Sequence, residues 1–138
     1  MKIKSFNRVK QYFADLLKPD GHDDLKTPPT SAEFALLFEH QPVGVLALEK
    51  GLWSFRYASQ FKMQSNLKPL PEFPDVNKVY QSETLWPFFA FRIPGMNQPQ
   101  IKELAQKEGI VGGDIVKLLS LFGRKSINNP FELELKEN

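Results

Sequence analysis

The sequence predicts an α+β domain, with a small antiparallel sheet or partly closed barrel, three short helices after it, a final strand, and an N-terminal amphipathic helix. Apolar and polar residues alternate with a period of two between residues 32 and 57, as in strands that bury one face. Between residues 84 and 122, polar capping residues, Pro and Gly delimit short helical segments instead. At 138 residues, the chain has the size of one ordinary domain.

Three strands begin the predicted domain. They cover residues 32–39, 43–49 and 52–57, with turns at 40–42 and 50–51. Connections this short join neighbouring antiparallel strands, so the three form a meander.

The third strand shows the period of two most clearly. Trp53, Phe55 and Tyr57 share one face, and Arg56 lies on the other. We expect the aromatic face to point into the interior and Arg56 to point to solvent. Apolar and charged residues alternate again over 131–136, which predicts a half-buried final strand.

Residues 58–83 contain Pro69, Pro71 and Pro74, which preclude a central strand or helix. We therefore expect an extended, ordered loop there. Helices are predicted over 85–93, 98–108 and 115–122. Each follows a polar residue that can cap it, respectively Thr84, Asn97 and Asp114.

The N-terminal region differs in character from the rest. Residues 1–18 are predicted as a helical arm, 19–31 as a polar linker punctuated by three Pro and one Gly, and 32–138 as the domain. In the arm, apolar residues recur at steps of three and four from Ser5 to Lys18. A helix this short is marginal in water. We expect it to pack on its own domain or in a partner's groove, and favour both over a membrane surface.

Charge and hydropathy exclude further classes of function. The arm carries five Lys or Arg and one Asp, a net charge of +4, so the total of +2 leaves −2 for residues 19–138. Strong direct binding of nucleic acid is therefore not expected. No apolar run is long enough for a secretory signal or a membrane span, and we expect a cytoplasmic protein without membrane contact.

The sequence also offers little for catalysis. It has no cysteine, which excludes disulfides, thiolate zinc sites and cysteine nucleophiles. His22 and His40, its only histidines, fall in the linker and in a turn, so no metal site is expected. Glu72, Asp75 and Glu83 lack a His or Ser partner at a telling spacing, which favours surface solvation over acid–base catalysis. We expect neither enzymatic activity nor a cofactor.

The aromatic run over residues 85–91 is the strongest candidate for binding a protein. Its large side chains cannot all lie on one face of a helix, so either core surrounds the helix or part of it meets a partner. Core packing is favoured, with Trp86 as an interface anchor the sharper alternative. The candidate protein-binding residues are Trp86, Phe89, Arg92, Arg56, Arg124 and Lys125. The last two also suit the end of a helix, where they complement its dipole.

From Phe34 to Leu135 the sequence resembles the N-terminal domain of HipA-type serine/threonine kinases. The residues that carry the resemblance are Val43-Gly44-Val45-Leu46, Gly51-Leu52-Trp53-Ser54-Phe55-Arg56-Tyr57, Trp86-Pro87-Phe88-Phe89, Ile93-Pro94, Leu104-Ala105, Gly109, Asp114, Leu118-Leu119 and Phe122-Gly123. The chain has no glycine-rich phosphate loop of the kind that phosphoryl transfer uses. The resemblance therefore implies a non-catalytic accessory domain.

More closely, the resemblance implies a stand-alone, HipS-like antitoxin of a HipBST-type toxin–antitoxin system. Such a domain would dock on a HipA- or HipT-like kinase toxin and neutralise it. Kinases of this type also act on DNA through a small, HipB-like helix-turn-helix protein. The alternative is therefore an accessory subunit of a DNA-binding complex for transcriptional autoregulation.

Overall fold

The computed structural model describes residues 11, 31–96, 98–107, 112–125 and 129–136. The predicted arm and linker lie outside the described residues, except for Gln11, which is helical and exposed, and Ser31. The described part of the chain is α+β, as predicted from the sequence.

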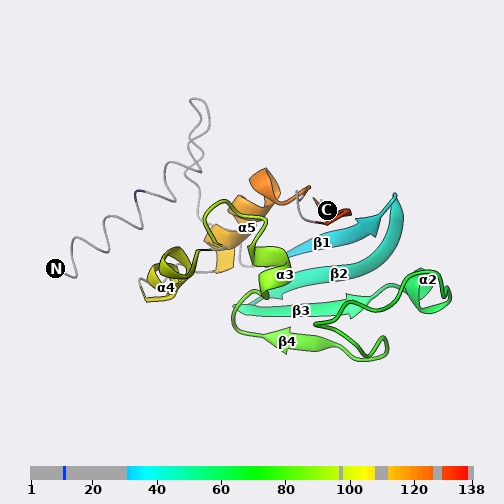
Figure 1. The fold of residues 1–138 in the computed structure, drawn as a ribbon. Coiled ribbons are helices and arrows are strands. Elements are labelled where there is room, and N and C mark those ends of the chain that lie inside the picture. Colours follow the sequence, from blue (N-terminus) through cyan, green and yellow to red (C-terminus); the bar gives the residue numbers. More distant parts are fainter. Residues whose placement is uncertain (1–10, 12–30, 97, 108–111, 126–128, 137–138) are drawn as a thin grey trace.

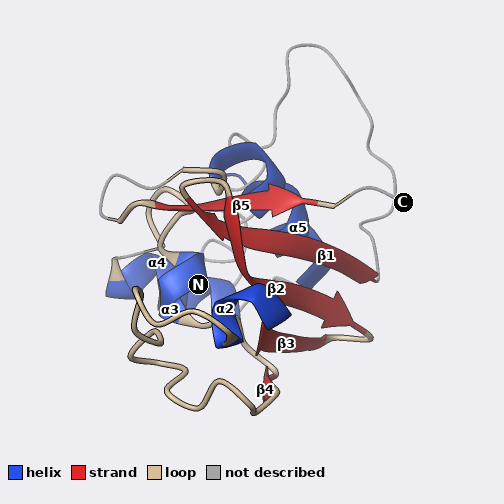
Figure 2. Ribbon diagram, turned by 90° about the vertical axis from the view of Figure 1, so that its right-hand side faces the viewer, coloured by secondary structure: helices blue, strands red, loops and turns tan. Residues whose placement is uncertain are grey.

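A five-stranded antiparallel sheet forms the body of the domain (Figure 1). Its strands are β1 (Ser31–Phe38), β2 (Gln41–Glu49), β3 (Leu52–Tyr57), β4 (Tyr80–Ser82) and β5 (Phe131–Leu135). Their order across the sheet is β4-β3-β2-β1-β5, so β5 at one edge and β4 at the other leave the sheet open (Figure 2). Of the two forms expected, the open sheet is the one adopted.

Tight turns with left-handed backbone set the register of the first three strands. Glu39 and His40 have φ values of 51° and 69°, and Lys50 and Gly51 have 51° and 79°. Two central residues with positive φ define the hairpin turn whose twist matches that of paired strands. The first turn thus begins one residue before the predicted turn at 40–42.

The predicted loop over residues 58–83 holds two elements that the sequence did not reveal. A short helix, α2 (Ser59–Lys62), buries only Phe61, and β4 pairs with β3 through Tyr80 opposite Phe55. The three prolines fall between these elements, so they restrict only the middle of the segment. The expectation of one continuous loop was wrong at both ends.

Three helices lie where they were predicted, with different ends. They are α3 (Pro87–Ala90), α4 (Pro99–Lys107) and α5 (Gly112–Phe122). Thr84 does not cap α3, because Trp86 occupies the N-cap position. The backbone N–H of Thr84 instead donates to the Ser82 hydroxyl at 3.1 Å. Asp114 lies within the first turn of α5, which starts at Gly112, three residues before the predicted start at 115. Asn97 lies outside the described residues.

One face of the sheet and the elements packed on it form the core. Phe34, Leu36, Leu46 and Phe55 from the strands are fully buried, as predicted for the aromatic face of β3. Other buried side chains of this cluster come from α2, the loop, α3 and the residues after it, and α5, and they include Phe61, Phe73, Phe89, Ile93, Leu118 and Leu119. Arg56 points away from this core and is exposed, as expected.

A buried tyrosine fixes the proline-containing loop against the sheet. The Tyr57 hydroxyl donates to the carbonyl oxygen of Phe73 at 2.6 Å and accepts from the N–H of Leu70 at 2.8 Å. These bonds satisfy two loop backbone groups that the core would otherwise leave without partners. They also bring the Phe73 ring to 4.5 Å from that of Phe55.

Candidate protein-binding surface

The helix α3 is too short to bury all of its aromatic residues. Phe89 is fully buried, whereas Trp86 is half-buried, its ring centroid 5.1 Å from that of Phe73 and 6.5 Å from that of Phe89. Phe91, just after the helix, leaves 46% of its surface exposed. The aromatic run is therefore divided between core and surface.

This division changes the role of one candidate residue. Phe89 was a candidate for partner contact together with Trp86, but it has no exposed surface and packs against Phe55, Phe73 and Phe88. A residue in this position supports its neighbours and cannot touch a partner of the folded domain. Trp86 keeps an accessible portion.

Arg92 is also mostly buried, with 6% of its surface exposed. Its Nη1 donates to the carbonyl oxygen of Gly123 at 2.9 Å, and its Nη2 donates to Asn129 Oδ1 at 3.1 Å and to the carbonyl oxygen of Phe131 at 2.9 Å. The guanidinium carbon lies 5.8 Å from the centre of the Phe88 ring. Arg92 thus ties the residues after α3 to the end of α5 and the start of β5.

The charge of Arg92 has no acidic partner in the described part of the chain. Burial alone lowers the pKa of its guanidinium to about 10. Its Nε has no hydrogen-bond partner among the described residues. The other two guanidinium nitrogens donate hydrogen bonds to three carbonyl or amide oxygens. These bonds hold the side chain in a single orientation.

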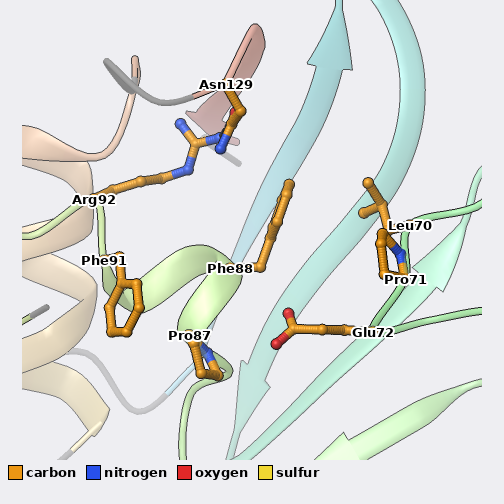
Figure 3. Close-up of a pocket in the computed structure, with 8 residues that line it drawn as sticks. All are labelled: Leu70, Pro71, Glu72, Pro87, Phe88, Phe91, Arg92 and Asn129. Atoms are coloured by element: carbon orange, nitrogen blue, oxygen red, sulfur yellow. Dashed lines mark hydrogen bonds between the residues drawn. The ribbon is translucent and has the colours of Figure 1, made fainter.

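A cavity of about 320 Å³ opens beside α3, and we call it the α3 groove. Its lining is formed by Leu70, Pro71, Glu72, Pro87, Phe88, Phe91, Arg92 and Asn129. The Phe88 ring stands between Arg92 on one side and Leu70 and Pro71 on the other (Figure 3). The groove is mainly apolar, with Arg92 and Glu72 as its charged residues.

The remaining basic candidates lie in two places. Arg124 and Lys125 directly follow Gly123, the residue that Arg92 holds, and both are exposed. The Arg124 guanidinium is 3.4 Å from a carboxylate oxygen of Glu134. Arg56 pairs with Val45 of the neighbouring strand, and both side chains lie on the face of the sheet away from the core. The structure therefore does not bring Arg56 together with Trp86.

Phe91 and Asn129 line the α3 groove, but the sequence did not identify them as candidate binding residues. The aromatic run left open whether core surrounds the helix or part of it faces outward. A helical wheel could not decide this, because α3 is only four residues long and the wheel needs more turns. Asn129 has no local signal, since its partner Arg92 lies 37 residues away in the sequence.

Neither a metal site nor a membrane span is found in the part of the chain that the structure describes. No three His, Cys, Asp or Glu side chains among the described residues converge as metal ligands would. None of the described helices is long and apolar enough to cross a bilayer.

Comparison with known families assigns the chain to one of them. Residues 34–127, more than half of the chain, match the family described as the HipA N-terminal domain. The chain belongs to this family. A HipA N-terminal domain is non-catalytic, and the family indicates a role related to toxin–antitoxin systems. No curated protein matches the chain.

The HipA N-terminal domain match ends before β5, yet β5 completes the sheet. Its strand pairs with β1 from Phe131 opposite Phe38 to Leu135 opposite Phe34. The bonds from Arg92 to Asn129 and Phe131 therefore join the matched region to residues that follow it.

Proposed function

We propose that this HipA N-terminal domain is a HipS-like antitoxin or regulatory subunit that docks on a HipA- or HipT-like serine/threonine kinase toxin and neutralises it. The family match over residues 34–127 is the observation that carries the proposal. In this function the domain binds the kinase as a protein ligand and performs no chemistry itself. Its site of action is the cytoplasm, where the kinase would be found.

The α3 groove and the residues around it are the proposed contact surface. Phe91 presents an exposed aromatic ring at the rim of this groove, and Trp86 presents a half-buried one at the start of the same helix. Aromatic residues and Arg dominate the binding energy of protein interfaces. A cavity of about 320 Å³ can receive an apolar side chain of the kinase.

Two basic residues lie near this surface, directly after the Gly123 that Arg92 holds. Arg124 and Lys125 are exposed and lie next to the segment that Arg92 fixes. They would pair with acidic residues of the kinase and raise the rate of association. Arg56, on the opposite face, would contact the kinase only if the kinase wraps around the sheet.

The proposal is tested by combining the purified chain with a HipA-type kinase from the same organism, the first choice being one whose gene adjoins that of the chain. We expect the two proteins to elute together in gel filtration and kinase autophosphorylation to fall as the chain is added. Separate elution with undiminished kinase activity would refute the proposal. Salt-sensitive binding of operator DNA by the chain alone would instead favour the accessory role in transcriptional autoregulation.

Two truncations locate the surface. Phe91→Ala should weaken kinase binding by roughly tenfold or more, because it removes an exposed ring at the groove. Met63→Ala is the matched control, since Met63 is an apolar side chain with 83% of its surface exposed and follows α2, far from α3 (Figure 1). Equal affinity of the two variants would move the interface away from α3.

Trp86→Ala needs a second measurement because Trp86 also packs on Phe73. We expect its effect on kinase affinity to exceed its effect on stability. A large fall in melting temperature with full affinity of the folded fraction would show that Trp86 serves the core alone.

A further inference from the structure

The sheet has a second face, directed away from the core, that we call the outer face. Its side chains come from alternate positions of four strands: Glu33, Ala35, Leu37, Val45, Ala47, Glu49, Ser54, Arg56, Glu132 and Glu134. None of them is buried in the described part of the chain. The outer face is thus an uncovered sheet surface, in contrast to the core face.

The middle of the outer face is apolar. Ala35 lies directly opposite Val45 on the neighbouring strand, and Leu37 and Ala47 continue the patch along β1 and β2. All four side chains are half-buried. An antiparallel sheet can leave one face in water, but burying an apolar patch under another element is favourable in free energy.

Carboxylates lie along the β5 side and at one end of this apolar patch, and the single guanidinium on the outer face, that of Arg56, lies opposite Val45 on the β3 side. Glu33 and Glu134 have cationic partners, Lys136 at 3.7 Å and Arg124 at 3.4 Å. Glu49 and Glu132, at opposite corners of the face, form no ion pair with any described residue. The element that covers the patch should therefore be amphipathic and basic.

Residues 5–18 have these properties. At 100° per residue, Phe6, Val9, Phe13, Leu16 and Leu17 fall within one stripe. Gln11 and Asp15 fall on the opposite side, and the structure describes Gln11 as helical and exposed. The net charge of +4 over residues 1–18 opposes that of the outer face.

The connection to the sheet also suits this placement. Ser31 pairs with Glu49 and shares the register of Glu33 and Ala35, so the chain enters β1 at a corner of the outer face. The twelve residues 19–30 can span up to about 40 Å. A helix over 5–18 is about 21 Å long, which fits on the nine-residue strand β2 of about 30 Å.

We infer that residues 5–18 pack as a helix on the outer face of the sheet, with their apolar stripe on Ala35, Leu37, Val45 and Ala47. This contact supplies the tertiary packing that a helix of about four turns requires in water. The inference does not depend on the proposed kinase partner, because both surfaces belong to this chain.

Disulfide trapping tests the inference, since the natural chain contains no cysteine. One full-length variant carries Val9→Cys in the stripe and Ala47→Cys on the outer face. The control carries Asp15→Cys with the same Ala47→Cys. Asp15 is closer to the sheet along the chain, so an undocked segment would trap it at least as fast. We expect intramolecular oxidation to be about tenfold faster for the Val9 pair, because only its side chain points toward the sheet.

Equal oxidation rates, or a faster rate for the Asp15 pair, would overturn the inference. A disulfide that forms between two molecules, seen as a dimer on a non-reducing gel, would assign the outer face to a second copy instead. The melting temperatures of the reduced variants show whether each is folded. Val45→Cys replaces Ala47→Cys if the latter prevents folding, because both lie on the same patch.

Discussion

Replacing Tyr57 by Phe removes one oxygen atom from the core and nothing else. The hydroxyl is the partner of two loop backbone groups, the carbonyl oxygen of Phe73 and the N–H of Leu70. A buried polar group that loses its partner costs about 1–3 kcal/mol. We therefore expect Tyr57→Phe to lower the free energy of unfolding by about 3 kcal/mol. For a domain of this size, the melting temperature should fall by roughly 10 °C.

Tyr80→Phe is the matched control. The Tyr80 hydroxyl also accepts a backbone N–H, that of Asp75 at 2.8 Å, but this bond is exposed and water can replace it. The expected loss is below about 1 kcal/mol. Urea unfolding followed by far-UV circular dichroism measures both variants. Equal losses, or a loss below about 1 kcal/mol for Tyr57→Phe, would refute the argument that Tyr57 holds the loop.

The same side chain predicts a pH dependence. Burial raises the pKa of Tyr57 above its usual 10.0, against a smaller lowering by the bond from Leu70. The folded protein then keeps the phenolic proton at a pH where the unfolded chain releases it. This contribution to stability is complete below pH 10 and is lost as pH rises through the folded pKa. Above pH 10, the free energy of unfolding of the Tyr57→Phe variant should therefore fall less steeply with pH than that of the natural protein.

Three further substitutions test the packing. Gly44→Ala should lower the free energy of unfolding by about 1–3 kcal/mol, because the added Cβ would lie 2.6 Å from Phe55 Cζ. Gly51→Ala places its Cβ in open space at φ 79°, so it tests backbone strain alone and should cost about 1 kcal/mol of stability. Phe89→Ala should cost about 3–5 kcal/mol as a core truncation, and a loss below 1 kcal/mol by thermal melting would contradict its burial. Arg92→Lys should lower the free energy of unfolding, measured with urea, by about 2 kcal/mol, because one ammonium group cannot reach all three acceptors. Unchanged stability would show that the guanidinium hydrogen bonds are not needed.

Local periodicity predicted most of the sheet, because each strand of the meander contains its own pattern. The alternation from Leu52 to Tyr57 specified β3 to the residue, and that from Phe131 onward specified β5. Periodicity could not predict the shortest elements. The three residues of β4 and the four of α2 contain too few positions to show a period. Their structure depends on the pairing of β4 with β3 and on the contacts of α2 with β2.

The candidate surface was less predictable than the fold. The sequence indicated that Trp86, Phe89 and Arg92 lie close together, but not which side chains face solvent. Arg92 carries a charge, which ordinarily indicates exposure, yet it is buried because acceptors 31, 37 and 39 residues away converge on it. Such long-range pairing leaves no trace in a local pattern.

The position of β5 has a consequence for how the domain is made. Strands β1, β2 and β3 are joined by two-residue turns and can pair while the rest of the chain is still being synthesised. Strand β5 pairs with β1 across about 100 residues of sequence, from Phe34 to Leu135. Contacts of such long range form slowly and can form only after translation has passed the last strand. Until then the β1 edge stays open on the nascent chain, ready for any other strand that reaches it first.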